Sequence, residues 1–210
     1  MSMEHRNFDQ EAEQWDERPQ RVQLAKDVAD AILGQLPQTT NLDVLDFGCG
    51  TGLLTLQLQP LVHAITGLDS SPGMLAVLNR KIDGLKLANA RTVLCDVVQG
   101  QKMPGRYDLV VSSMTLHHVE HIAPLLALFF AVLVPGGRLC IADLDLEQGR
   151  FHTDNTGVFH FGFDREALSA SLRQAGFHRV SAQTATHIVK TDSQPQPTRF
   201  SVFLLSGEKP

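Results

Sequence analysis

Short apolar runs and longer stretches of helical periodicity alternate along the first part of the chain. Apolar residues recur every three to four positions over 21–36, which predicts an amphipathic helix that Pro37 should end. Four apolar runs of strand length follow, and Ser71-Pro72 has the composition of a helix start. The predicted strands cover 43–47, 62–69, 90–94 and 108–112, and the predicted helices between them cover 53–58 and 72–81. This alternation is typical of an α/β domain with a parallel sheet.

The rest of the chain continues the alternation and then departs from it. Pro135-Gly136-Gly137 should end one helix, and Asp164 should cap the next. Two strand-like runs close the chain without a helix between them, and only antiparallel strands can be joined by so short a loop as 193–198. Helices are predicted over 124–133 and 165–175, and strands over 138–144, 181–190 and 199–205. We therefore predict one domain, in which residues 1–40 form an arm and helix packed on a core of 41–210.

Composition and charge narrow the class of protein. Hydrophobic residues make up 43% of the 210 residues, which is ordinary for a folded globular domain and unlike a disordered chain. The formal net charge is −5, from 18 basic and 23 acidic residues, and no basic run appears. A general nucleic-acid partner is therefore not expected. The sequence gives no indication of the oligomeric state.

The cysteines and the apolar runs predict where the protein is found. Three widely spaced cysteines, Cys49, Cys95 and Cys140, form neither a C-x-x-C motif nor a zinc-ligand spacing, which indicates reduced thiols. Residues 1–14 are too polar for a secretory signal, and the longest apolar stretch, 122–134, is too short to span a bilayer. We expect a soluble, cytoplasmic protein without a membrane partner.

Three glycines spaced two apart, Gly48, Gly50 and Gly52, join the strand 43–47 to the helix 53–58. Glycine permits a tight turn, a close approach of backbone to ligand, or close packing of helix on strand. A strand, a glycine loop and a helix together form the unit in which backbone approaches a nucleotide. Such turns also occur without a ligand, so the loop alone leaves a purely structural role open.

Carboxylates at the ends of the predicted strands make a ligand site more specific. Asp46, Asp69, Asp96 and the pair Asp143/Asp145 end four strands, at the sheet edge where ligands of open α/β folds bind. Asp69 lies 21 residues after Gly48, an interval at which an acid can accept hydrogen bonds from ribose hydroxyls. So many acids disfavour a pyrophosphate, and the third glycine comes one residue early for the dinucleotide fingerprint G-x-G-x-x-G. Asp46 instead suits a ligand with an amino group or a sulfonium.

These residues resemble the motifs of class I S-adenosylmethionine-dependent methyltransferases. The segment 44–52 resembles the first motif, Gly67-Leu68-Asp69 with 71–75 the second, and Cys95-Asp96-Val97 the third. The later motifs of the small-molecule branch are similar to 107–119 and 133–139, and the final helix to 164–177. The likeness covers about 35–210. It implies a Rossmann-like, seven-stranded sheet whose closing hairpin strand is antiparallel.

The resemblance also implies a cofactor and its binding residues. S-adenosylmethionine would be the cofactor, with Asp69 on the ribose hydroxyls and Asp96 near the adenine amino group. Trp15 either fixes the N-terminal arm to the core or brings it over the ligand. The predicted cofactor-binding residues are Asp46, Gly48, Cys49, Gly50, Gly52, Asp69, Ser70, Met74, Cys95, Asp96, Val97, Ser113 and, from the N-terminal arm, Trp15. The implied reaction is an in-line methyl transfer to a small-molecule acceptor.

Several histidines are candidates for a base that takes the proton of an oxygen or nitrogen acceptor. We name His117, His118 and His160, and expect the adjacent pair to point in opposite directions in an extended chain. The spacing of His152, His160 and Asp154 fits no known metal-ligand pattern, so no metal is predicted. The predicted substrate pocket consists of Met114, His118, Phe159, His160 and Phe161, although these phenylalanines could instead anchor the 147–163 segment to the core.

Two other functions stay open at this point. A nicotinamide-dependent oxidoreductase would use the same fold, but it offers no reason for Asp46 and Asp96. A non-catalytic S-adenosylmethionine-binding protein would keep the cofactor site without a productive acceptor pocket. The sequence determines neither the acceptor nor the atom that would be methylated.

Overall fold

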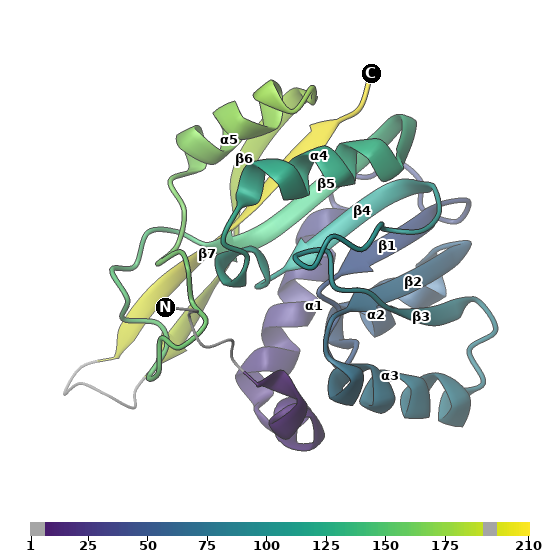
Figure 1. The fold of residues 1–210 in the computed structure, drawn as a ribbon, viewed down its shortest axis with the longest axis horizontal. Helices are drawn as coiled ribbons and strands as arrows, with labels where there is room; N and C mark the ends of the chain where they lie inside the picture. The colour runs from purple at the N-terminus through teal and green to yellow at the C-terminus, as the bar shows by residue number, and fades with distance from the viewer. Residues whose placement is uncertain (1–6, 191–196) are drawn as a thin grey trace.

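A computed structural model describes residues 7–190 and 197–210 and shows a single seven-stranded sheet with helices on both faces (Figure 1). The strand order is β3-β2-β1-β4-β5-β7-β6. The strands are β1 (Asp43–Phe47), β2 (Ala64–Asp69), β3 (Ala90–Leu94), β4 (Tyr107–Ser113), β5 (Leu133–Leu144), β6 (His178–Lys190) and β7 (Thr198–Glu208). The helices are α1 (Pro19–Leu33), α2 (Leu53–Leu58), α3 (Pro72–Leu85), α4 (Ile122–Val132) and α5 (Arg165–Gln174).

The directions of the strands confirm the predicted fold class. β1 pairs in parallel with both β2 and β4, so the order of the sheet reverses between β1 and β4. β7 runs antiparallel to both β5 and β6, as the closing hairpin requires. Most of the loop predicted at 193–198 lies outside the described residues. The carboxyl ends of β1 and β4 therefore meet at the point where open α/β sheets bind ligands.

Two layers of helices cover the sheet because the central strands are apolar on both faces. In β4, Val110 faces the cluster that contains α4 and α5, whereas Leu109 and Val111 face the cluster that contains α1 and α2. Figure 1 shows α4 and α5 together on one side of the sheet and α1, α2 and α3 on the other. In the described part of the chain, no helix combines the length and hydropathy needed to traverse a bilayer.

Element ends differ from the predictions where glycine or tertiary pairing decides them. α1 ends at Leu33, before Pro37, because Gly34 forms its carboxyl cap and donates its N–H to Asp30. β5 begins at Leu133 and runs through Pro135-Gly136-Gly137, which was predicted to be a turn. This segment pairs with the carboxyl terminus, through Gly136 N to Lys209 O at 2.9 Å and Lys209 N to Gly137 O at 2.8 Å. A local break in the pairing with β4 absorbs the irregularity.

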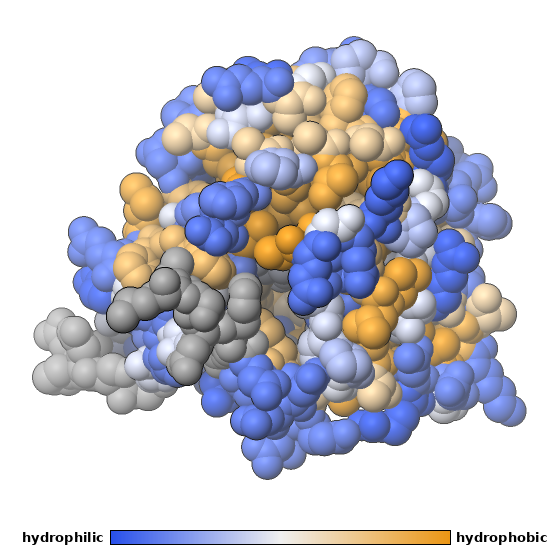
Figure 2. All heavy atoms as spheres, viewed as in Figure 1, coloured by the Kyte–Doolittle hydropathy of each residue, from blue (hydrophilic) through white to orange (hydrophobic). Residues whose placement is uncertain are grey.

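The N-terminal arm packs across α3 beside the glycine loop. It contains two 3₁₀ helices, Phe8–Gln10 and Ala12–Glu17. Figure 2 shows apolar side chains at the centre of the face viewed in Figure 1, with hydrophilic ones around them.

Asp9 Oδ1 accepts hydrogen bonds from Ser71 Oγ and from Gly73 N, so the arm holds the first turn of α3. The hydrogen bonds of Asp9 thus attach the arm to the start of α3.

Candidate functional site

A cavity of about 940 Å³ lies at the carboxyl ends of β1, β2 and β4. The glycine loop, the turn after β3 and the histidine-containing turn after β4 form its inner walls. The N-terminal arm, residues 151–153 of the segment after β5 and the end of β6 form its outer walls. Every residue predicted to bind a cofactor lines this cavity, with the exception of Gly52. Its volume is at the upper end of the range of small-ligand sites.

The glycine loop is held open by backbone hydrogen bonds to the neighbouring strand. Gly48 N and Cys49 N both donate to Leu68 O, at 2.8 and 3.1 Å. Gly48 and Gly50 have φ values of +69° and +54°, which side chains disfavour. A Cβ at Gly48 would also lie 2.3 Å from the Thr115 side chain, so this position admits only glycine. The loop therefore brings bare backbone to the cavity.

Gly52 has a different role from the one predicted. It lies at the amino end of α2 with φ of +85°, and a Cβ there would lie 2.3 Å from a methyl group of Leu78 in α3. It is not among the residues that line the cavity. The third glycine serves close packing between helices, because the loop has already turned away from the cavity at this point.

Asp69 connects the glycine loop to the start of α3. Its Oδ2 accepts from Gly50 N at 2.8 Å, and its Oδ1 accepts from Ser71 N at 2.9 Å. Burial raises the pKa of this carboxyl, and the backbone donors at Ser71, Gly50 and Ser70 oppose the rise. Each carboxylate oxygen has a second lone pair, so the side chain can accept further hydrogen bonds from a ligand.

Asp46 is almost fully buried and also lines the cavity. Thr55 Oγ1 donates to its Oδ2 at 2.6 Å. Burial raises the pKa of Asp46 to about 7, the Thr55 hydrogen bond opposes this rise, and the charge of Asp69 adds to it. A cation bound next to Asp46 would favour its ionised form.

Only three of the five strand-end acids lie at the cavity, which corrects the predicted acidic rim. Asp96 lines the cavity, and its Oδ1 accepts from Val98 N at 3.0 Å. Asp143 and Asp145 do not line it. Asp143 is buried against His117, and Asp145 forms a two-pronged ion pair with Arg165, at 2.6 Å for each contact. The last two acids are therefore paired with other side chains and take no part in the cavity wall.

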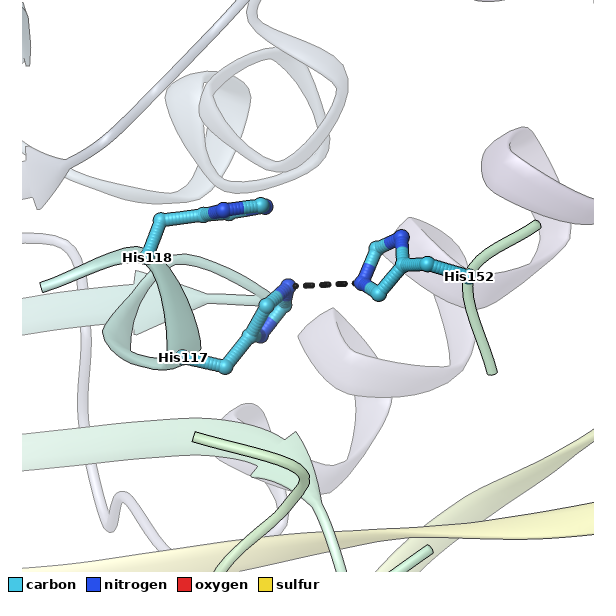
Figure 3. A group of neighbouring side chains, drawn as sticks. All are labelled: His117, His118 and His152. Atoms are coloured by element: carbon cyan, nitrogen blue, oxygen red, sulfur yellow. Dashed lines mark hydrogen bonds between the residues drawn. The ribbon is translucent and has the colours of Figure 1, made fainter. Parts of the chain in front are cut away.

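The histidine pair differs from the prediction because it is not in extended chain. Leu116–His118 is a 3₁₀ helix, and both His117 and His118 line the cavity, with ring centroids 4.2 Å apart. The bend begins at Met114, whose φ is +56°. His152, from the segment after β5, faces them, with its Nε2 3.2 Å from His117 Nε2 (Figure 3). We call His117, His118 and His152 the histidine group.

The predicted substrate wall is displaced along its segment. Phe159, His160 and Phe161 do not line the cavity, although the predicted residues Met114 and His118 do. The backbone N–H groups of Phe159 and His160 donate to His117 O, and His160 Nε2 lies 3.0 Å from Val119 O. These contacts anchor the segment to the turn after β4. The same segment lines the cavity through Phe151, His152, Thr153 and Gly157.

Trp15 belongs both to the packing of the arm and to the wall of the cavity. Trp15 packs against a small apolar cluster between the arm and α3, and it also lines the cavity. The guanidinium of Arg21 lies 3.4 Å from the centre of its ring, and Phe8 meets it edge-on with centroids 6.0 Å apart. Sequence reasoning missed Phe8 and Arg21 as cavity residues, and only the proximity of aromatic and basic residues to Trp15 could have indicated them.

Comparisons with known proteins place this geometry in a family context. A family model described as a methyltransferase domain matches residues 44–137. An uncharacterized methyltransferase of Schizosaccharomyces pombe is 32% identical over 137 residues, which cover 59% of this chain and 48% of that protein. A trans-aconitate 2-methyltransferase of Methylobacterium nodulans is 35% identical over 112 residues, covering 52% of this chain and 41% of the relative. The chain thus aligns with about half the length of these relatives.

Solved structures share the whole fold at low identity. A putative methyltransferase of Haloferax volcanii, solved with its activator, superposes with a TM-score of 0.77 over 97% of both chains at 18% identity. A phosphoethanolamine N-methyltransferase of Haemonchus contortus, in complex with S-adenosyl-L-methionine, gives 0.69 at 18% identity, over 87% of this chain and 52% of that one. At such identities the likeness establishes the fold.

Proposed function

Because the chain belongs to the class I S-adenosylmethionine-dependent methyltransferase family, we propose that it transfers the methyl group of S-adenosylmethionine to a small molecule bound in the same cavity. The observation that carries this proposal is the link formed by Asp69 between Gly50 N and Ser71 N. Asp69, at the end of β2, is thereby held directly beside the glycine loop. A glycine loop next to an acid at the end of the following strand is the arrangement in which α/β folds bind a nucleoside.

The residues around the cavity divide naturally among the parts of the cofactor. Asp69 would accept the ribose hydroxyls, and Asp96, with Val97 beside it, would contact the adenine. Asp46 is almost fully buried in the cavity wall, and its carboxylate would suit the positively charged amino-acid end of the ligand. The sulfonium of the bound cofactor supplies the electrophilic methyl group.

The protein's own contribution is to orient the acceptor and to exclude water. A well-oriented pair of reactants can lower a barrier by roughly 7–11 kcal/mol. The arm and the segment after β5 cover the cavity from two sides, which leaves room for a small molecule beside a nucleoside. The named activity of the trans-aconitate relative, on a small acid, supports this class of acceptor. The acceptor would lie on the side formed by the histidine group.

Turnover with small molecules tests the proposal. The protein should convert S-adenosylmethionine to S-adenosylhomocysteine in the presence of a fractionated metabolite mixture, and mass spectrometry should find one metabolite that has gained a methyl group. Asp69→Ala should abolish the product in the same mixture. Methyl transfer to RNA or protein alone would contradict the acceptor class. Tight S-adenosylhomocysteine binding with no transfer to any acceptor would instead favour the non-catalytic alternative.

A further inference from the structure

The histidine group brings three imidazoles from two separate segments to one wall of the cavity. His117 and His118 come from the turn after β4, and His152 comes from the segment after β5 (Figure 3). Each offers a ring nitrogen, and these nitrogens lie within 4.8 Å of one another. Imidazole is the commonest protein ligand of zinc and related ions. No motif in the sequence connects the three residues, because 33 residues lie between His118 and His152 in the chain.

The hydrogen bonds at two of the rings fix which nitrogen can bind an ion. His117 Nδ1 lies 2.7 Å from Asp143 Oδ1, and His118 Nδ1 lies 2.7 Å from Gly157 O. A carbonyl oxygen and an ionised carboxylate only accept, so each Nδ1 carries the hydrogen and each neutral ring has its lone pair on Nε2. A histidine that ligates a metal is usually held in this way, by a carboxylate or a carbonyl on its other nitrogen.

Asp143 holds the His117 ring in position. Its side chain is completely buried, and the donors that the structure gives it are His117 Nδ1, His117 N and Leu144 N. A carboxylate on the other nitrogen of the ring is the outer-shell partner that a metal-ligating histidine usually has. The His117 ring is therefore fixed with its Nε2 toward His152.

The spacing of the nitrogens agrees with a tetrahedral ion. Two nitrogens bound at about 2.1 Å to such an ion lie about 3.4 Å apart. His117 Nε2 and His152 Nε2 are 3.2 Å apart. The widest pair in the group is at most 4.8 Å apart, so it needs to close by up to about 1.4 Å on binding. We propose that His117, His118 and His152 bind one divalent zinc-class ion, whose fourth position opens into the cavity.

The proposed ion would also act on the acceptor, a consequence that rests on the proposed function. An acceptor hydroxyl or amine that occupied the fourth position would lose its proton more readily, because a bound divalent ion lowers the pKa of its ligands. The binding of the ion does not depend on that function. The competing explanation is a hydrogen-bonded chain from Asp143 through His117 to His152, without an ion.

Metal titration of untagged, full-length protein tests the proposal. After stripping with a chelator, the protein should take up one Zn²⁺ per chain, measured by competition with a chromophoric chelator. Co²⁺ at the same site should give the intense visible absorption of a tetrahedral ion. His152→Ala should weaken Zn²⁺ binding by at least about 100-fold, the upper end of what loss of an outer-shell partner costs. His178→Ala is the matched control, because His178 is exposed on β6, and it should bind Zn²⁺ like the wild type.

His118→Gln provides a second variant, and circular dichroism shows whether each variant is folded. If the wild type takes up no stoichiometric Zn²⁺, or if folded His152→Ala and His118→Gln bind it as tightly as the wild type, the proposal is wrong. S-adenosylhomocysteine binding, measured on the same preparations, separates this failure from a failure of the proposed function. Retained nucleoside binding without metal binding would overturn the metal site alone.

Discussion

Asp69→Ala is expected to remove detectable S-adenosylhomocysteine binding from a protein that remains folded. The carboxylate would accept two ribose hydroxyls, and it also positions Gly50 and Ser71 through their backbone N–H groups. Hydrogen bonds to a charged group contribute about 1.5–3 kcal/mol each, so losing two of them lowers the affinity by at least about 100-fold. Isothermal titration calorimetry of the wild type and the variant measures this loss.

Asp145→Ala is the matched control for this experiment. Asp145 also ends a strand, but it pairs with Arg165 outside the cavity. The control should bind S-adenosylhomocysteine like the wild type, although the loss of its ion pair will lower its stability. Asp69→Asn, which keeps the shape of the side chain, should bind weakly as well, since its amide nitrogen cannot accept. Unchanged affinity in folded Asp69→Ala would show that the ribose assignment is wrong.

Asp46 should make the free energy of unfolding depend strongly on pH. Its pKa is raised from 3.8 to about 7 in the folded protein, mainly by burial. Between pH 3.8 and about pH 7, Asp46 is therefore protonated in the folded state and ionised in the unfolded state. The free energy of unfolding falls as pH rises through this window, because the folded state binds the additional proton. Raising a pKa from 3.8 to about 7 corresponds to about 4 kcal/mol. The stability that comes from the proton on Asp46 is fully present below about pH 4 and is lost by about pH 7.

Asp46→Asn isolates this contribution because asparagine does not titrate. Urea unfolding of wild type and variant at a series of pH values should show the wild type losing about 4 kcal/mol relative to the variant between about pH 4 and 7. The amide oxygen that this substitution introduces can still accept from Thr55 Oγ1, so local packing is largely kept. A difference between the two proteins that is the same at every pH would contradict the raised pKa.

Local sequence patterns predicted the sheet, and the resemblance to known motifs named part of the cavity wall. The strand over Asp43–Phe47 and the helix over Leu53–Leu58 have the predicted bounds. Apolar runs, glycine and proline determine such bounds through the backbone of adjacent residues, so the sequence shows them directly. The cavity residues near the cofactor motifs could be named because parallel strands end at one edge of the sheet. Spacing did not reveal that Gly52 packs against Leu78, since that contact depends on where α3 lies.

The histidine group could not be predicted from the pattern of the chain. The orientation of His117 and His118 follows from the left-handed backbone at Met114 and the 3₁₀ turn after it, which polar and apolar periodicity does not encode. His152 follows Phe151, whose N–H donates to the buried carboxylate of Glu147. This hydrogen bond within the irregular segment after β5 helps to place His152 beside the other two histidines. Such a segment has no period, so its contacts are set by tertiary structure.

Ligand-dependent thermal stability tests the central claim, that this cavity binds S-adenosylmethionine, most directly. A ligand that binds only the folded protein at 100 times its dissociation constant adds about 2.7 kcal/mol of stability. S-adenosylhomocysteine should raise the melting temperature in proportion to the logarithm of its concentration, and NAD at equal concentrations should leave it unchanged. Stabilisation by NAD with none by S-adenosylhomocysteine would contradict the account and favour a nicotinamide-dependent enzyme.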